Sequence, residues 1–172
     1  MGSRGWACRS WQAHCSWRQG TWACNLPLRS RVCRVLRLLD IREAALDVNE
    51  VLEAVADDRA GGVSVFVGNV RDHDGGQGVS YLDYSQHPSA IDRLREVAEE
   101  VAGEFEVLAL AAVHRVGRLE IGEAAVIVAC ATAHRDEAFV ACRALIDRLK
   151  ERVPIWKHQV FADGHEEWVG TP

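Results

Sequence analysis

The sequence predicts an α+β fold with a largely antiparallel sheet and two main helices. Three observations predict this class. Short runs of alternating, β-branched residues indicate strands, two longer segments carry apolar residues at helical spacing, and strands and helices follow one another in a mixed order. A chain of 172 residues is long enough to bury the core of one domain and short for two.

The first half of the domain is expected to hold a short helix, a hairpin and a long helix. An Asp followed by a Glu three positions later is typical of a capped helix start, which predicts a helix over residues 47–58. β-Branched runs predict strands at 63–70 and 79–84, joined by a turn rich in Asp and Gly. Helical spacing of apolar residues then predicts a helix over 89–105.

The second half is expected to hold two strands, a second long helix and a terminal hairpin. The helix begins near Arg135 and ends before Pro154, because proline lacks an N–H group and disfavours the helical conformation in the residue before it. The strands are expected at residues 106–114, 124–133, 155–161 and 166–169.

Charge is distributed unevenly along the chain. The formal net charge of -5 argues against a general nucleic-acid-binding protein, which needs a basic surface. No apolar run approaches the roughly 18 residues of a membrane span. Residues 1–39 hold seven arginines and no Asp or Glu, so the rest of the chain is strongly acidic and any anion site in it must be a local cluster.

Residues 1–35 differ in composition from the rest and contain four of the six cysteines and four of the six tryptophans. A zinc module needs cysteines two to four positions apart, and these are spaced more widely. A transit peptide is rich in Arg and poor in acid, but four tryptophans do not fit it. We expect a disordered extension or a non-native start, followed by one folded domain over residues 36–172.

The two remaining cysteines, Cys130 and Cys142, lie inside apolar patterns. Free cysteine is among the most buried residue types, so both are expected in the core. The spacing does not resemble the disulfide framework of a secreted protein, which favours a cytoplasmic location.

The most informative feature of the composition is its lysines. Of 20 basic residues only two, Lys150 and Lys157, are lysine. Arginine is permanently charged, whereas a lysine amine becomes a base or nucleophile when desolvation or a neighbouring cation lowers its pKa. The chain is expected to reverse at Pro154, which would point both amines into one cleft. The alternative is that both are ordinary surface lysines.

Further cationic residues are expected near that cleft. His134 and Arg135 stand where a strand passes into a helix, and backbone N–H groups at a helix start favour anions. Simple capping of that junction is the alternative. Arg71 follows a run expected to be a buried strand and precedes the Asp-Gly loop, a position from which we expect its side chain to reach a pocket rim. Together these residues predict a cationic pocket for a small phosphorylated or carboxylate-bearing substrate. Histidine spacing predicts no metal site, and the glycine-rich loop lacks the ending of a phosphate-binding P-loop.

Four separated blocks resemble, in this order, the family of the large, catalytic subunit of molybdopterin synthase. The resemblance covers about residues 36–172, and its ending is similar to the actinobacterial branch of the family. The blocks are the strand and loop at 66–73, the segments 114–117 and 133–135, and the run 149–157.

The resemblance implies an α/β hammerhead-type fold and a homodimer core within a heterotetramer. It also implies a small ubiquitin-like sulfur-carrier subunit at each end, whose C-terminal Gly-Gly tail carries a thiocarboxylate. Two sulfurs would pass from that tail to cyclic pyranopterin monophosphate, forming the dithiolene of molybdopterin. The resemblance further implies that neither a membrane nor nucleic acid takes part and that the large subunit needs no metal or other cofactor.

The resemblance also implies roles for single residues. Lys150 and Lys157 match catalytic lysines of the family, with Lys150 in the central role. Substrate-binding residues of the family match the following set: Phe66, Arg71, His134 and Arg135. The family can add a C-terminal arginine across the dimer interface, and this chain ends in Thr-Pro without one. The alternative function is a non-catalytic module that binds a ubiquitin-like tail or a phosphorylated ligand.

Overall fold

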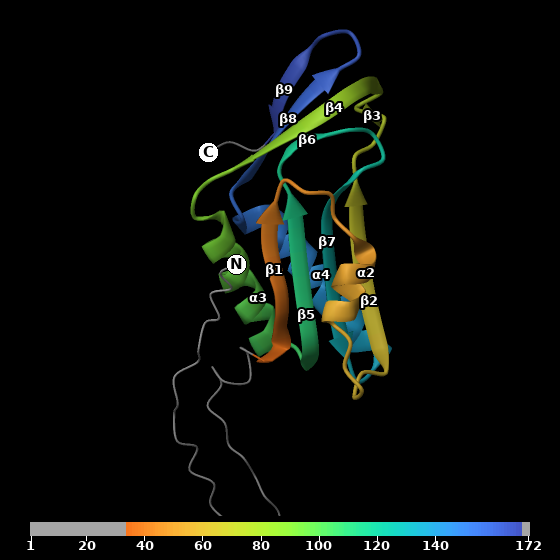
Figure 1. Ribbon diagram of the computed structural model, residues 1–172, viewed down its shortest axis with the longest axis vertical. Coiled ribbons are helices and arrows are strands. Elements are labelled where there is room, and N and C mark those ends of the chain that lie inside the picture. The colour runs from red at the N-terminus through yellow and green to blue at the C-terminus, as the bar shows by residue number, and fades with distance from the viewer. Residues whose placement is uncertain (1–33, 170–172) are drawn as a thin grey trace, which may run out of the picture.

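The computed structural model describes residues 34–169, and the expectations for residues 1–33 and for the last three residues lie outside this range (Figure 1). The elements follow the mixed order that the sequence predicts. They are β1 (Leu36–Arg42), α2 (Val48–Ala54), β2 (Gly62–Asn69), β3 (His73–Asp74), β4 (Gln77–Gln86), α3 (Ala90–Glu104), β5 (Val107–Arg115), β6 (Gly117–Leu119), β7 (Ala124–Thr132), α4 (Arg135–Arg152), β8 (Ile155–Phe161) and β9 (Glu166–Val169).

The strands form two sheets. The larger has the order β1-β5-β7-β2, with β1 parallel to β5 and the other pairs antiparallel. The smaller has the order β3-β4-β8-β9, and β6 pairs with β4 beside it. In Figure 1 the smaller sheet lies above the ends of the larger one, which leaves a junction between the two. The predicted α+β class with a largely antiparallel sheet is confirmed.

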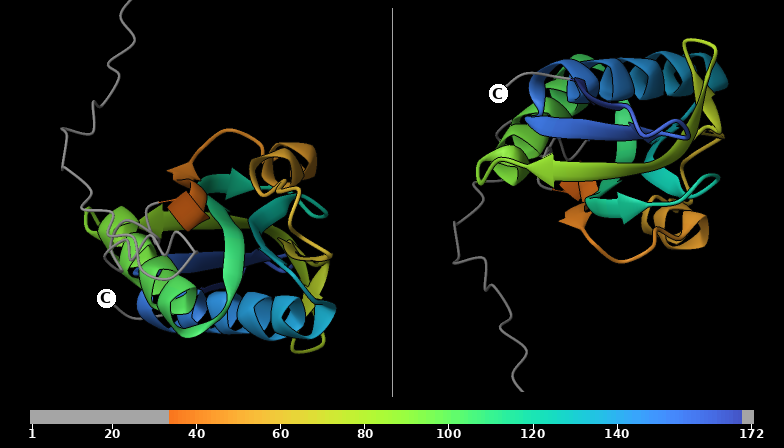
Figure 2. Two further views of the ribbon diagram at one scale, coloured as in Figure 1. Left: turned by 90° about the horizontal axis from the view of Figure 1, so that it is seen from below. Right: turned by 90° about the horizontal axis from the view of Figure 1, so that it is seen from above.

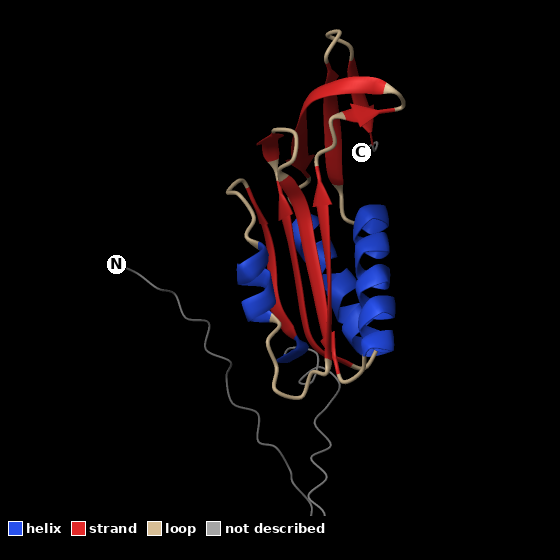
Figure 3. Cartoon of the chain, turned by 90° about the vertical axis from the view of Figure 1, so that its right-hand side faces the viewer, coloured by secondary structure: helices blue, strands red, loops and turns tan. Residues whose placement is uncertain are grey.

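Helices cover both faces of the larger sheet (Figure 2). Helices α3 and α4 pack on one face, where their apolar side chains join Leu110, Val128 and Cys130 in the main core. The short helix α2 packs on the other face over Val113 and Ile127. Figure 3 shows the sheet edge-on, with helices on either side. Burial on both faces explains why β5 and β7 are apolar along nearly their whole length.

Helix α4 is held by a regular apolar stripe. Its buried residues recur three or four positions apart, which places them on one face of the helix. The helix ends at its C-cap Val153, directly before Pro154, and β8 begins at Ile155. The buried residues of the stripe are Ala138, Ala141, Cys142, Leu145, Ile146 and Leu149.

Some elements differ from the sequence-based expectations. Strand β1 is not expected from the sequence, because charged Arg37, Asp40 and Arg42 interrupt its apolar pattern. The short strand β3 lies in the segment expected to be a turn, β6 lies between two predicted strands, and α2 is shorter than the predicted helix. Cys130 and Cys142 are buried free thiols, as expected. Within residues 34–169, the helices lack the length and apolarity needed to cross a bilayer.

The space around two glycines differs sharply, and Gly61 lies in close contact with the backbone just before α4. A Cβ at Gly61 would lie 2.4 Å from the Ala133 carbonyl oxygen, whereas a Cβ at Gly103, inside α3, would meet no atom within 4 Å. Gly61→Ala should therefore lower the free energy of unfolding by roughly 1–3 kcal/mol through overpacking. Gly103→Ala should raise it by about 0.5–1 kcal/mol because alanine favours the helix. Urea unfolding measures both, and equal effects of the two changes would contradict the described packing.

Candidate active site

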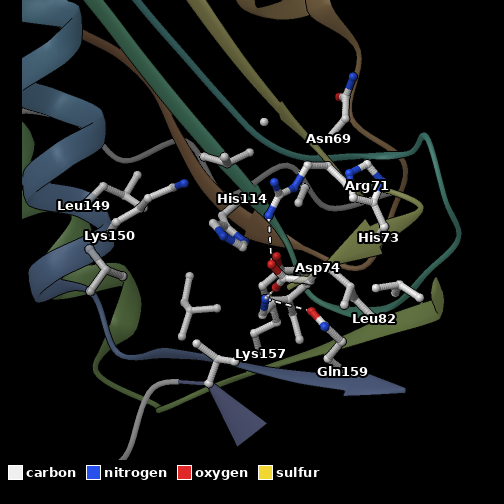
Figure 4. Close-up of a pocket in the computed structure, with 18 residues that line it drawn as sticks. Asn69, Arg71, His73, Asp74, Leu82, His114, Leu149, Lys150, Lys157 and Gln159 are labelled. Atoms are coloured by element: carbon white, nitrogen blue, oxygen red, sulfur yellow. Dashed lines mark hydrogen bonds and ion pairs between the residues drawn. The ribbon is translucent and has the colours of Figure 1, made fainter. Parts of the chain in front are cut away.

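A pocket of about 370 Å³ opens at the junction of the two sheets (Figure 4). The ends of β2 and β5, the start of β7 and the last turn of α4 form one side, and β4 and β8 form the other. Several lining residues bear chemically active groups, and apolar residues fill the spaces between them. The polar and charged lining residues are Asn69, Arg71, His73, Asp74, Tyr84, His114, Lys150, Lys157 and Gln159.

Both lysines of the chain line this pocket, so the central expectation from the sequence is met in space. Lys150 projects from the last turn of α4, and Lys157 projects from β8 after the reversal at Pro154. The Lys150 Nζ lies 5.9 Å from the centroid of the Phe66 ring, within the range of a cation–π contact. No carboxylate among residues 34–169 forms an ion pair with Lys150, so its charge is available to an anionic ligand.

Lys157, in contrast, is held by neighbours. Its Nζ donates to Gln159 Oε1 at 2.8 Å and to Asp74 Oδ2 at 3.2 Å. The other Asp74 oxygen accepts from Arg71 at 3.1 Å, so one carboxylate bridges two cations. The hydrogen bond from Lys157 holds the pKa of Asp74 below its usual value, and that carboxyl is ionised at neutral pH. These contacts fix the Lys157 amine in one place.

His114, at the end of β5, contributes a neutral imidazole. The side chain is buried, its Nδ1 lies 2.7 Å from the Arg115 carbonyl oxygen, and its ring meets the edge of the Tyr84 ring at 5.3 Å. Because a carbonyl oxygen only accepts, Nδ1 carries the proton and Nε2 keeps its lone pair. Burial, together with the Lys150 charge, lowers the pKa of His114 to about 4. At neutral pH this group is therefore an acceptor without charge.

The other residues expected at the site fall into two groups. Arg71 lines the pocket, and Phe66 borders it through its contact with Lys150. His134 and Arg135 do not line it. Arg135 begins α4 and Lys150 stands in its last turn, and a rise of 1.5 Å per residue separates them by about 22 Å along the axis. The expectation that all these cations meet within one chain is thus corrected, because a straight helix holds them apart.

His134 and Arg135 are nevertheless not used as simple caps. His134 occupies the N-cap position of α4, but its side chain makes no capping hydrogen bond. The Arg135 side chain is 81% exposed and lies 3.8 Å from the Asp136 carboxylate. Both side chains are exposed, and the Arg135–Asp136 pair is open to solvent, so a further molecule can reach them.

Sequence reasoning did not single out His114, Asp74 or Gln159 as site residues. His114 and Arg115 are the two polar residues that end an otherwise apolar strand, and this break in the pattern is a usable signal for His114 in retrospect. Asp74 stands in a turn-like Asp-Gly stretch and Gln159 in an ordinary strand, so neither has a distinctive pattern. Among the described residues, no three His, Cys, Asp or Glu side chains gather as metal ligands do.

The chain also matches a known protein family by sequence. The sequence model of the MoaE protein family matches residues 41–152, most of the described chain. The chain belongs to the MoaE family. The matched segment contains β2, the pocket ends of β5 and β7, and α4 with Lys150.

Relatives within the family agree with this membership. The molybdopterin synthase catalytic subunit 1 of Mycobacterium tuberculosis is 42% identical over 131 residues, which cover 76% of this chain and 88% of the relative. The catalytic subunit of Halalkalibacterium halodurans is 37% identical, with 76% and 83% covered. The crystal structure of molybdopterin synthase from Staphylococcus aureus superposes with a TM-score of 0.72 at 31% identity, covering 77% of this chain and 97% of that one.

The buried His114 predicts a specific loss of stability in acid. Below pH 6.5 the unfolded chain binds a proton on this imidazole that the folded chain does not bind until about pH 4, so folding becomes less favourable as pH falls through that window. The contribution lost is roughly 3 kcal/mol. In His114→Asn, which retains a donor for the Arg115 carbonyl, urea unfolding between pH 7 and 4 should show a weaker pH dependence. An identical dependence in both proteins would contradict a buried neutral imidazole.

Proposed function

We propose that this chain is the catalytic subunit of a molybdopterin synthase. In this role it transfers two sulfurs from the thiocarboxylated C-terminus of a small ubiquitin-like subunit to cyclic pyranopterin monophosphate, forming the molybdopterin dithiolene. The observation that carries the proposal is the convergence of the only two lysines of the chain, with Arg71, in one pocket of a MoaE-family fold. The functional unit is the domain over residues 36–172.

The charges of the pocket suit the two reactants. A thiocarboxylate and a cyclic phosphate are both anions, so holding them together requires several fixed cations at close range. Arg71, Lys150 and Lys157 supply these on an otherwise acidic chain. Phe66 and the apolar lining limit water around the reacting groups, which strengthens each charge interaction.

The chemistry is a nucleophilic transfer of sulfur. The thiocarboxylate sulfur bonds to a substrate carbon as a carbon–oxygen bond at that carbon breaks, and the oxygen leaves as water or as the freed phosphate ester. A water molecule then cleaves the acyl–sulfur bond, which leaves sulfur on the substrate and a carboxylate on the tail. Lys150, which has no carboxylate partner among the described residues, is the amine available to act. Two roles match its position: proton transfer as sulfur adds, and transient capture of the tail's acyl group as an amide. Lys157, fixed by Asp74 and Gln159, binds and orients the anions.

A homodimer explains the position of His134 and Arg135. Strand β2 is an edge of the larger sheet, and its side chains Val63, Phe66 and Val67 are exposed apolar groups. Phe139 and Val140 of the adjoining α4 are exposed as well. An exposed edge with an apolar surface is the usual sign of a protein partner. We infer that β2 pairs antiparallel with β2 of a second copy.

An antiparallel pair of β2 strands places the start of the strand in one copy beside the end of the strand in the other copy. Gly62, at the start of β2, lies against Arg135, and Asn69, at its end, lines the pocket. The eight residues of β2 span about 23 Å, close to the separation of Arg135 from Lys150. A two-fold axis through the middle of β2 would therefore bring His134 and Arg135 of one copy to the pocket of the other.

The two buried cysteines bear on the cellular compartment in which the protein works. Cys130 and Cys142 are buried and free among the described residues. Proteins of reducing compartments keep such thiols unpaired. We therefore infer that the reaction takes place in the cytoplasm.

The catalytic role of Lys150 is tested in a reconstituted assay with the thiocarboxylated small subunit and cyclic pyranopterin monophosphate. Lys150→Ala should reduce molybdopterin formation by about 100-fold or more, as expected when a group acting on the reacting atoms is removed. The control Arg143→Ala removes an exposed charge from the same helix and should leave product unchanged. Full turnover by Lys150→Ala would contradict the proposal, and tail binding without product in the unaltered chain would favour the non-catalytic binding module.

Completion of the site across the dimer predicts complementation. Lys150→Ala and Arg135→Ala chains should each be inactive alone. Mixed dimers hold one pocket with both defects and one with none, so random mixing should restore about a quarter of the unaltered activity. Absence of any recovery, with mixed dimers verified by mass spectrometry, would place Arg135 and Lys150 in the same chain's site or remove Arg135 from it.

A further inference from the structure

Asp74 has an unusual position for an acidic residue. Of the described residues that line the pocket, it alone carries a carboxylate, and it shares the pocket with three cations and pairs with two of them. One oxygen accepts from Arg71 at 3.1 Å and the other from Lys157 at 3.2 Å (Figure 4). The group therefore occupies the place of an anion in a pocket built for anions.

Gln159 adds an independent observation. It is 1% exposed and lines the same pocket, on the same face of β8 as Lys157. Its Oε1 accepts from Lys157, which fixes the orientation of the amide and leaves Nε2 as a donor. The amide lies near enough to Asp74 to help lower the pKa of that carboxyl, yet Nε2 completes no hydrogen bond with any described residue.

A buried donor without a partner is costly, typically by about 1–3 kcal/mol. Asp74 satisfies Arg71 and Lys157 but leaves the Gln159 nitrogen unsatisfied. An external carboxylate that is free to settle deeper would satisfy Lys157 and Gln159 together. The donor set thus fits a carboxylate-type ligand better than it fits the residue that occupies it.

The hairpin that carries Asp74 allows such an exchange. Strand β3 has only two residues, and the turn after it consists of Gly75 and Gly76, both with positive φ. Two such glycines form the tight turn of a hairpin and offer no side chain that would pack against the body of the protein. The Asp74–Arg71 pair is also a weak tether, because the Arg71 side chain is 69% exposed.

We propose that Asp74 is an internal occupant of the tail subsite, and that the carboxylate-type end of the partner's tail replaces it on Lys157 and Gln159. The proposal rests on the proposed function and names what the tail must displace. When Asp74 leaves, Arg71 is released as well and can bind the phosphate of the substrate. Tail binding therefore exposes a cation that the second reactant needs.

The experiment is a calorimetric titration of the full chain with a synthetic peptide that ends in Gly-Gly and a free carboxylate. Asp74→Asn should bind this peptide about fivefold more tightly than the unaltered chain, since self-occupancy lowers apparent affinity by the fraction of open sites. Gln159→Leu should bind it about tenfold more weakly through loss of a hydrogen bond to a charged group. The same peptide with an amidated end should bind Asp74→Asn and the unaltered chain equally.

Asp72→Asn is the matched control. It removes the same charge from the same loop, but its carboxylate pairs with His73 and touches neither Arg71 nor Lys157. Asp72→Asn should bind the peptide as the unaltered chain does. Asp74→Ser serves as a second replacement if thermal unfolding shows that Asn disturbs the hairpin.

The outcomes separate this proposal from the proposed function. Equal tightening in Asp72→Asn and Asp74→Asn, or no tightening in Asp74→Asn, overturns the internal occupant. If the unaltered chain still forms molybdopterin in that case, the proposed function stands. Tighter peptide binding that is seen only in Asp74→Asn and only with the free carboxylate supports Asp74 as the internal occupant. This result would hold even if the unaltered chain formed no molybdopterin and the proposed function were wrong.

Discussion

The packing of α4 against the larger sheet is the constraint on which the site depends. Its apolar stripe is buried against the sheet and α3, and Pro154 forces the chain out of the helix straight into β8. Lys150 therefore stands in the last helical turn and Lys157 on the facing strand. Buried apolar contacts set both positions, and they hold the two positive charges in one pocket even though like charges repel each other.

In the pocket between α4 and β8, the two lysines have different neighbours. Lys157 is neutralised and fixed by Asp74 and Gln159, whereas Lys150 lies beside the Phe66 ring with no carboxylate partner in the described part of the chain. The neutral His114 adds no competing charge at neutral pH. One amine is thus suited to holding an anion in place and the other to acting on it.

Much of the fold was predictable because apolar spacing is a local property. The stripes of α3 and α4 and the β-branched run of β2 predict those elements directly. Strand β1 was not predictable in this way, because it gains its place by pairing with β5 rather than by its own pattern.

The site was predictable only where composition or a motif marked a residue. The rarity of lysine marked Lys150 and Lys157, and both line the pocket. Asp74 and Gln159 acquire meaning only from their distances to Lys157, which no spacing reveals. Arg135 does not line the pocket of its own chain, because α4 places it about 22 Å from Lys150 along the helix axis. The predicted helix over residues 135–153 already implied this separation, whereas a contact across a dimer cannot be seen in the spacing of one chain.

The convergence of the lysines on the partner's tail is tested most directly by zero-length cross-linking. Carbodiimide activation of the small subunit's C-terminal carboxylate joins it to an amine within bonding distance. Because the chain has only two lysines, peptide mapping identifies the site without ambiguity. The account predicts an amide between the terminal glycine and one of the two pocket lysines, either Lys157, which holds the tail, or Lys150, which acts on it. A cross-link to the N-terminal amine alone, in a complex that forms stably, would contradict it.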